Sequence, residues 1–416
     1  MFTTENYLTA DLPGTGGVFK ATPEDFLVEE IPLYEPSGEG EHLYLTIEKR
    51  GITTLEALRR LAAALGAAER DCGYAGLKDS VGITRQAVSL PRVDADRALA
   101  LDLPGIRVLA AERHRNKLKP GHLAGNRFRI RLREVAPQAA TLAEGVLTVL
   151  MRRGVPNYFG EQRYGAQGNS HLIGRALLAG DHRAAVVALL GEPERVSDPS
   201  WRQAIAAFQA GEYGRCCELL PGFCRTERGV VARLCSQPDN WAGAVKTIHP
   251  RLLSLYLSAC QSALFDRVVA ARLATDTLDQ LLRGDLAFRH DNGACFRVTD
   301  PASEAERLLG LQISPSGPMF GASLLLPEGE PLAIEQGVLT ESGLSLASFA
   351  GAGKLRLAGE RRPLRVPLCD ASVSWDSEGL WLSFRLPRGA YATVVLREVM
   401  KVAVTGQEPA TGYTGS

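Results

Sequence analysis

The feature that most constrains the fold is a run of nine residues, Gly125 to Arg133, in which arginines alternate with apolar side chains from Arg127 onward. A period of two residues is the period of a β-strand, so the run predicts a strand. Phe128, Ile130 and Leu132 then share one face of it. The other face carries a row of arginines, namely Arg127, Arg129, Arg131 and Arg133.

The same run is the last part of the most strongly basic segment of the chain, whose net charge as a whole is zero. Between residues 107 and 133 there are nine lysines and arginines against the single acid Glu112, whereas the whole chain has 47 basic and 47 acidic residues. Arginines on one strand face repeat about every 6 to 7 Å, which approximates the spacing of nucleic-acid phosphates. Two interpretations stay open, an RNA-binding surface and an ordinary solvated strand face.

Both strands and helices are expected elsewhere in the first third of the chain. Alternation predicts strands from His42 to Glu48 and from Thr84 to Leu90. Between them, Thr53 or Thr54 caps a helix that Gly66 ends. Phe26 is expected in a loop among acidic residues, and a further helix is predicted from Thr141 to Arg153.

Residues 157 to about 362 have a different, alanine-rich texture. The helices predicted there are Ser170 to Leu178, Arg183 to Leu190, Trp201 to Ala210 and His249 to Ala274. Strands are expected at Leu286 to Val298 and Ala322 to Leu326.

From Arg365 the pattern returns to strands. Leu380 to Leu386 and Tyr391 to Arg397 are expected to form a hairpin, joined by residues 387–390. Strands before residue 135 and after residue 365 predict one α+β domain split by a large insertion. Residues 1–156 and 363–416 are assigned to that domain, and residues 157–362 to the insertion.

The candidate for chemistry is Asp79, within the stretch Tyr74 to Ser80. Gly76 lets the backbone turn where a side chain would clash, and Lys78 sets a cation beside the carboxylate. A lysine beside an aspartate is common in solvated loops, so Lys78 and Asp79 alone are weak evidence for a catalytic site. Other stretches of the chain are needed to support it. The stretch Val155 to Gly165 mixes aromatic rings, amides and one arginine, which suits RNA, although buried rings in a turn are the alternative. Together with the arginine strand, these residues indicate an RNA-binding enzyme with an aspartate.

Neither a metal site nor a membrane segment is expected. None of the eight cysteines forms a C-x-x-C pair or lies beside histidines at zinc spacing, so we interpret them as free thiols in a reducing cytoplasm. No apolar run reaches the roughly 18 residues that a membrane span needs. The opening MFTTENYLTADLPG has no basic start and no apolar core, unlike a secretion signal. We therefore expect a cytoplasmic monomer, since no dimerisation stripe is evident.

Five stretches resemble, in the same order, the motifs of TruD-family tRNA pseudouridine synthases. They are Lys20 with Pro23 to Phe26, Ala75 to Asp79, Gly125 to Phe128, Pro156 to Gly165 and Leu386 to Thr393. The resemblance implies a pseudouridine synthase fold, with a mixed, mostly antiparallel sheet and flanking helices, interrupted by the family's own inserted α+β domain. It implies isomerisation of uridine to pseudouridine in tRNA, typically at position 13 in the D-arm region, with no cofactor.

The resemblance also implies roles for individual residues. Asp79 matches the family nucleophile. The residues that match uridine-contacting positions are Phe26, Asn126 and Tyr391. Possible supports for RNA or for the active site are Lys20, Lys78, Arg127, Phe128, Arg129 and Arg163. Two features depart from the family pattern, because Tyr391 replaces the usual phenylalanine and the segment from Trp201 to Gly243 makes the insertion longer.

The mechanism has two open routes. An aspartate with an ordinary pKa of about 3.9 is ionised at neutral pH, so it can attack the ribose anomeric carbon or deprotonate the ribose to form a glycal. The target base must first leave the stack, which costs a few kcal/mol, and stacking on an aromatic ring returns about 1–3 kcal/mol. We assign that stacking to Tyr391 or Phe26. We expect Asn126 to form hydrogen bonds with the edge of the uracil, because its amide both donates and accepts.

Two other classes of protein remain as alternatives. One is a catalytically silent RNA-binding or RNA-folding protein on the same scaffold, which would not need Asp79. The other is a nucleoside hydrolase or glycosidase, which wants paired carboxylates, with Glu24 or Asp25 as the second.

Overall fold

The computed structural model describes residues 7–350 and 357–402. They form two compact units, one that ends at Val155 and resumes at Val366, and one that consists of Pro156–Arg365. Two short strands, β8 (Val155–Pro156) and β13 (Arg365–Val366), pair with each other at the points where the chain passes between the units. The assignment of the second unit as the family's inserted domain stays a prediction.

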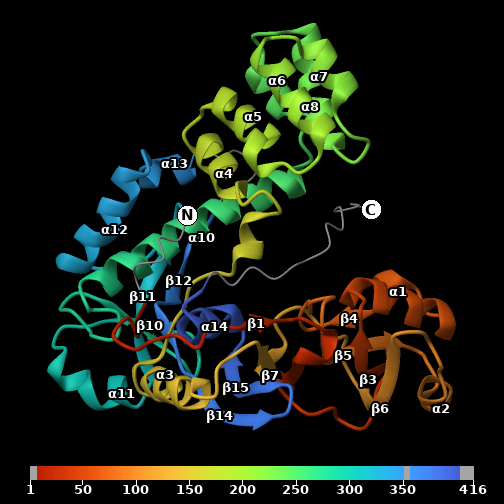
Figure 1. Cartoon of the computed structure of the whole chain (residues 1–416), viewed down its shortest axis with the longest axis vertical. Coiled ribbons are helices and arrows are strands. Elements are labelled where there is room, and N and C mark those ends of the chain that lie inside the picture. The colour runs from red at the N-terminus through yellow and green to blue at the C-terminus, as the bar shows by residue number, and fades with distance from the viewer. Residues whose placement is uncertain (1–6, 351–356, 403–416) are drawn as a thin grey trace. The chain divides into compact units, whose positions relative to one another are not determined.

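A nine-stranded sheet forms the centre of the first unit (Figure 1). Its main path runs β14 (Cys369–Asp376), β15 (Gly379–Pro387), β7 (Leu123–Arg133), β2 (Phe26–Pro32), β5 (Ile83–Pro91), β3 (His42–Arg50) and β6 (Ile106–His114). Off this path, β1 (Val18–Phe19) pairs with β7, and β4 (Gly73–Tyr74) pairs with β5. The pairing of β2 with β5 is parallel and the other pairings within this sheet are antiparallel, as predicted.

Helices of the first unit begin and end at residues whose side chains or backbone favour those positions. The helices are α1 (Thr54–Leu65), α2 (Ala95–Leu99), α3 (Ala139–Arg153) and α14 (Ala392–Met400), with 3-10 turns at Pro23–Asp25 and Glu69–Asp71. Thr53 Oγ1 accepts the Glu56 N–H at the start of α1, and Gly66 ends it with a φ of 73°. The buried side of α1 packs in one core with Leu43, Leu45 and Ile47 of β3.

The C-terminal segment differs from the prediction, because Tyr391 to Arg397 is not a strand of a hairpin. Ala392–Met400 is the helix α14, in which Ala392, Val395 and Val399 are buried at helical spacing. Valines favour strands in general, which is why the segment was misassigned. The buried Glu398 carboxylate accepts the backbone N–H groups of Leu8 and Thr9, at 2.9 and 3.1 Å, and so ties the helix to the start of the chain.

Two smaller expectations were also wrong. Phe26 begins strand β2 instead of lying in a loop. Residues 322–326 form no strand.

The two faces of β7 have the contrasting character that its sequence predicts. Phe128, Ile130 and Leu132 are buried, whereas the arginines lie on the opposite face. The cross-strand register shows which residues of the neighbouring strands share a face with Asn126. Glu30 of β2 lies opposite Asn126 on one side, and Leu386 of β15 lies opposite it on the other. We call the face that carries Phe26, Glu30, Asn126 and Phe128 the inner face, and the face that carries the arginines the outer face.

The second unit combines a small sheet with many helices. Its strands run in the order β10 (Cys295–Arg297), β9 (Leu286–Arg289), β11 (Ile313–Met319) and β12 (Glu360–Pro363). Its helices are α4 (Ser170–Leu178), α5 (His182–Leu190), α6 (Pro199–Gln209), α7 (Tyr213–Leu219), α8 (Arg225–Ser236), α9 (Trp241–Val245), α10 (Pro250–Ala274), α11 (Ala305–Leu309), α12 (Glu330–Glu341) and α13 (Leu346–Ala350), with 3-10 turns at Glu161–Tyr164, Pro193–Arg195 and Ala302–Glu304. The helices predicted at 170–178, 183–190, 201–210 and 249–274 are all present.

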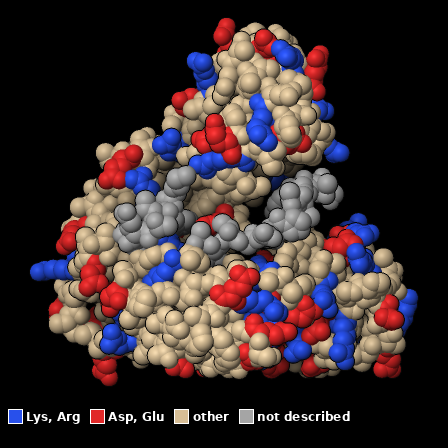
Figure 2. Space-filling model, in the orientation of Figure 1, with Lys and Arg blue, Asp and Glu red and all other residues tan. Residues whose placement is uncertain are grey.

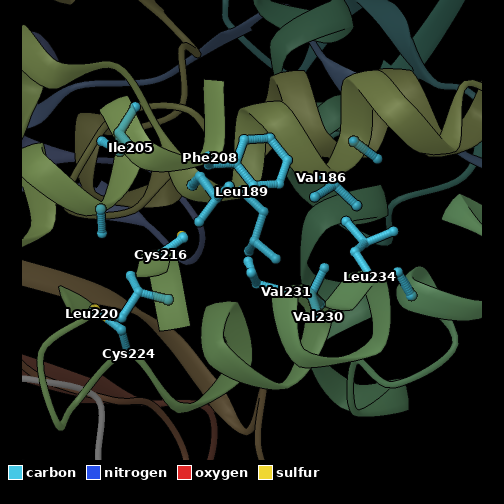
Figure 3. Close-up of a cluster of buried hydrophobic side chains, with 14 of the residues drawn as sticks. Val186, Leu189, Ile205, Phe208, Cys216, Leu220, Cys224, Val230, Val231 and Leu234 are labelled. Atoms are coloured by element: carbon cyan, nitrogen blue, oxygen red, sulfur yellow. The ribbon is translucent and has the colours of Figure 1, made fainter. Parts of the chain in front are cut away.

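Residues 201–243, which the sequence predicts to lengthen the insertion, supply most of α6, α7 and α8. Figure 3 shows how these helices bury Phe208, Val231 and Leu234 in one apolar core with Val186 and Leu189 of α5. The segment is therefore a packed helical part of the second unit.

Candidate active site

Asp79 lies in the loop between β4 and β5, above the inner face of the sheet. Its side chain is 33% exposed, and its Oδ2 atom lies 2.9 Å from the ammonium of Lys20, which is 7% exposed. The same ammonium lies 4.2 Å from the centre of the Phe26 ring, an attractive cation–π distance. Lys20 has a φ of 59°, a left-handed conformation that costs a non-glycine residue about 1–3 kcal/mol. Such strain is typical of functional sites.

A second lysine holds the backbone of the same loop. Lys49 is fully buried, and its ammonium donates to the carbonyls of Ile52, Lys78 and Asp79, at 2.8, 3.3 and 2.6 Å. Burial lowers the pKa of Lys49 to about 8, against the attraction of the Asp79 carboxylate. A buried cation whose partners are carbonyls thus fixes the position of the candidate catalytic residue.

Lys78 points to the inner face and joins two strands there. Its ammonium lies 2.8 Å from Glu30 Oε2 of β2 and donates to Asn126 Oδ1 of β7, also at 2.8 Å. Burial raises the pKa of Glu30 above its ordinary value, although the Lys78 charge opposes this. Because Lys78 occupies Oδ1, the amide nitrogen of Asn126 is the donor that remains for a ligand.

Glycine is needed in this loop because neighbouring groups approach it closely. Gly76 does not have a positive φ, but a Cβ there would lie 3.2 Å from the Lys78 ammonium and 3.6 Å from Glu30 Oε2, so a side chain would crowd that ion pair. Gly82 has a φ of 143°, and a Cβ there would lie 2.6 Å from the carbonyl oxygen of Phe26. Gly82 therefore lets the loop approach β2 closely.

Tyr391 lies where β15 gives way to α14, as the residue that precedes the helix. The register of β15 sets Leu386 opposite Asn126, and the Arg388 N–H donates to the carbonyl of Ala124 at 3.1 Å. Tyr391 is half-buried and Phe26 is buried, at 4% exposure. The structure thus places Phe26 and Asn126 on the neighbouring strands β2 and β7, with Tyr391 four residues beyond the end of β15, the strand on the other side of β7.

Arg127 and Arg129 lie on the outer face, away from Asn126, and neither contacts Asp79. Arg127 pairs with Glu29 at 3.2 Å, and Arg129 lies 4.5 Å from the Trp381 ring. Of the residues named as possible supports, Lys20 is the one that pairs with Asp79. Acidic and basic side chains are interspersed over the surface in Figure 2, as expected for a neutral chain with paired arginines.

The second carboxylate that a glycosidase would need is engaged elsewhere. Asp25 is buried, and Arg133 donates to both of its oxygens at 2.8 Å. Burial favours the neutral acid, but the Arg133 hydrogen bonds keep the pKa of Asp25 below its ordinary value. Glu24 pairs with Arg50. Neither acid contacts Asp79, so the structure disfavours a paired-carboxylate mechanism.

The remaining predicted support, Arg163, belongs to the second unit. Its guanidinium donates to the hydroxyls of Ser262, at 3.0 Å, and Ser258, and lies 5.6 Å from the Phe159 ring. Within residues 7–350 and 357–402, no cluster of three or more His, Cys, Asp or Glu side chains is arranged to hold a metal ion. In the same ranges, no helix has both the length and the apolar character to cross a membrane.

Comparison with known proteins identifies the family. Residues 3–399 match the family model described as tRNA pseudouridine synthase D (TruD). The chain belongs to the TruD family. This confirms the resemblance seen in the sequence, and with it the class of isomerases that form pseudouridine.

Relatives and a solved structure agree over nearly the whole chain. The tRNA pseudouridine synthase D of Geobacter metallireducens is 62% identical over 397 residues, which cover 95% of this chain and 98% of the relative. The tRNA pseudouridine synthase D of Thermus thermophilus is 40% identical, over 95% of this chain and 92% of the relative. The crystal structure of the putative tRNA pseudouridine synthase D from Methanosarcina mazei superimposes with a TM-score of 0.84 at 27% identity, over 94% of this chain and 95% of that one. The fold class predicted from the resemblance is therefore confirmed.

Sequence reasoning missed two buried charged residues that contact this candidate site, Lys49 and Glu30. A signal for Lys49 was present, because it continues the inward positions of Leu43, Leu45 and Ile47. A charged residue at an inward position of a strand needs a specific partner. Glu30 occupies an inward position of β2 in the same way.

Proposed function

We propose that this protein isomerises uridine to pseudouridine at position 13 of tRNA, with Asp79 as the catalytic residue and no cofactor. The observation that carries the proposal is the Asp79 carboxylate, partly exposed and paired with Lys20, in a chain that belongs to the TruD family along nearly its whole length. Family membership supports the reaction and the tRNA substrate. The position in tRNA and the role of Asp79 rest on the resemblance and on this geometry.

The geometry suits either of the two routes. In the first, a carboxylate oxygen of Asp79 attacks the ribose C1′ as the bond to N1 of uracil breaks. The uracil anion turns, its C5 displaces the aspartate from C1′, and the proton on C5 is lost to solvent while N1 gains one. In the second route, Asp79 takes a proton from C2′ as the bond from C1′ to N1 breaks. C5 of uracil then attacks C1′ of the resulting glycal as Asp79 returns the proton to C2′, and the proton on C5 is again exchanged for one on N1. Lys20 orients the carboxylate in both routes.

Recognition of the base falls to residues around this carboxylate. Asn126 offers its amide N–H groups to a uracil carbonyl, because Lys78 occupies its oxygen. Phe26 lies buried beside the Lys20 ammonium, so Tyr391 has the more accessible ring. We therefore assign stacking on the flipped base to Tyr391, which returns about 1–3 kcal/mol of the flipping cost.

The test is pseudouridine formation on unmodified tRNA transcripts, detected as carbodiimide-dependent stops in primer extension. Wild type should produce one stop at position 13, and Asp79→Asn should bind tRNA normally but produce none. Glu29→Gln is the matched control, because it removes a carboxylate on β2 that pairs on the outer face. A stop elsewhere in the tRNA would refute the position, and an active Asp79→Asn variant would refute the catalytic role.

The alternative functions give different results in the same experiment. Tight tRNA binding with no stop on any transcript would indicate the silent RNA-binding protein. Release of free uracil would indicate a hydrolase. Monomeric state and cytoplasmic location stay predictions, which gel filtration and cell fractionation can test.

A further inference from the structure

An open cavity of about 510 Å³ lies in the first unit, apart from the Asp79 carboxylate. Its lining residues come from the segment after β2 and from the connection between β6 and β7. They are Tyr34, Glu35, His114, Asn116, Lys117, Lys119 and His122. The volume is within the range of small-ligand sites, about 300–1,000 Å³.

Aromatic rings form one side of this cavity, and their positions are fixed. The rings of Tyr34 and His114 stack at 5.3 Å with 23° between their planes, and Tyr44 packs against His114 at 4.8 Å. The Tyr34 hydroxyl lies 2.7 Å from Nδ1 of His122, which leaves Nε2 of that ring for a ligand. Tyr44 donates to the carbonyl of Asn116 at 3.0 Å. Ordered rings of this kind are a stacking surface for a base.

Two lysines also line the cavity, beside one exposed acid, Glu35. Lys117 donates to the backbone carbonyl of Arg70 at 2.8 Å, and Lys119 is exposed. Among the described residues, neither lysine forms an ion pair with a carboxylate. On the outer face, by contrast, Arg127 pairs with Glu29. Of the lysines and arginines in the basic segment 107–133, Lys117 and Lys119 are the two that line this cavity.

The cavity is joined to the loop that carries Asp79. The Gly121 N–H donates to the carbonyl of Ala75 at 2.8 Å, and the Arg388 guanidinium donates to the carbonyl of Gly121 at 2.8 Å. His122 precedes Asn126 by four residues, which is about 13 Å along an extended strand. That distance suits a nucleotide close to the flipped uridine.

We propose that this cavity binds a tRNA nucleotide that flanks the flipped uridine. The base lies against the rings of Tyr34 and His114, and the phosphate contacts Lys117, Lys119 and His122. The inference rests on the proposed function. The combination of stacked rings with unpaired cations supports a nucleotide over a simple anion, which would need no ring surface.

The experiment measures binding of unmodified tRNA transcripts as a function of salt. Lys117→Gln with Lys119→Gln should weaken binding about tenfold at moderate salt and lower the slope of log K against log salt by about 1.5, as expected for two phosphate contacts. Tyr34→Leu should weaken binding roughly fivefold or more without changing the slope, because stacking is not ionic. The turnover number at saturating tRNA should stay within about twofold of wild type for both variants, since neither change touches Asp79.

A matched control is Arg97→Gln with Arg107→Gln, which removes the same charge from two exposed positions of the first unit that do not line the cavity and should leave tRNA binding unchanged. Should the double lysine variant melt early, Lys119→Gln alone, at an exposed position, should still lower the slope by roughly 0.7.

Polyphosphate serves as a second probe. Equal losses of affinity for tRNA and polyphosphate in the Tyr34→Leu variant would overturn the base contact, and unchanged tRNA binding in the lysine variants would overturn the site. Failure of the proposed function is separate, because it appears as absent pseudouridine with wild type, whatever the binding data show.

Discussion

Replacing Lys49 with methionine should change the stability of the protein little and its catalytic activity strongly. The side chain is fully buried and the pKa of its ammonium falls from 10.5 to about 8. Since each tenfold change in proton affinity is worth about 1.4 kcal/mol, holding the charged form in the core costs about 3 kcal/mol. Methionine has a similar length and removes this cost.

The opposing term comes from the carbonyls that lose their donor. Lys49 serves the carbonyls of Ile52, Lys78 and Asp79, and each buried acceptor left without a partner costs about 1 kcal/mol or somewhat more. The two terms offset each other, so the unfolding free energy of Lys49→Met should lie within about 2 kcal/mol of wild type.

Activity should change far more than stability. The 2.6 Å hydrogen bond to the Asp79 carbonyl fixes the backbone next to the carboxylate, and a misplacement of about 1 Å can cost about a hundredfold in rate. We expect single-turnover pseudouridine formation to fall about 10- to 100-fold, with tRNA affinity preserved.

The assay pairs single-turnover kinetics with urea unfolding. Glu48→Gln, a change at the neighbouring residue on the other face of β3, is the control and should leave both measurements near wild type. A Lys49→Met protein that reacts at the wild-type rate would refute the positioning role. A loss of activity that merely follows the unfolded fraction would refute it too.

Three further predictions concern the same cluster. Because the pKa of Lys49 is lower in the folded chain, the unfolded chain binds more protons between about pH 8 and 10.5. The unfolding free energy of wild type, measured by urea titration, should therefore rise by about 3 kcal/mol relative to that of Lys49→Met as the pH rises across that interval. Parallel curves of unfolding free energy against pH for the two proteins would contradict this. Lys20→Met should lower kcat by removing the cation beside Asp79, with partial recovery in Lys20→Arg, and equal rates for the two variants would exclude a role for the charge. Lys78→Met leaves the Glu30 carboxylate buried and unpaired, so thermal unfolding should show a loss of about 3–5 kcal/mol. Adding Glu30→Gln should restore most of that stability, and a double variant as unstable as the single one would show that the pair is not the cause.

Local sequence signals predicted the elements whose causes are themselves local. The alternation of β7 and the residues that cap α1 act over a few positions, so both elements were found close to their observed bounds. Helix α14 was missed because its valines favour strands, whereas its helical state depends on contacts made by distant residues. Leu8 and Thr9, which bond to Glu398, are such contacts.

The candidate site was predictable as a set of residues but not as a set of contacts. The motifs pointed to Asp79 and Asn126, yet nothing in them shows that Lys20 pairs with the aspartate across 59 residues of sequence. The charge of the arginine row was evident, whereas its pairing with acids such as Glu29 depends on sheet register. Partners of this kind follow from tertiary structure.

The split of the first unit around the second has a consequence for how the chain is synthesised. Strand β7 ends at Arg133, and its neighbour β15 begins at Gly379, about 245 residues later. At roughly 5–20 residues per second, a ribosome needs roughly 12–50 s to deliver the missing strand. The contiguous second unit emerges completely during that interval and is able to fold first. Meanwhile one edge of β7 waits unpaired, and charged side chains on an edge discourage association with other strands. We therefore expect the arginine row to discourage aggregation of the nascent protein before the sheet is closed.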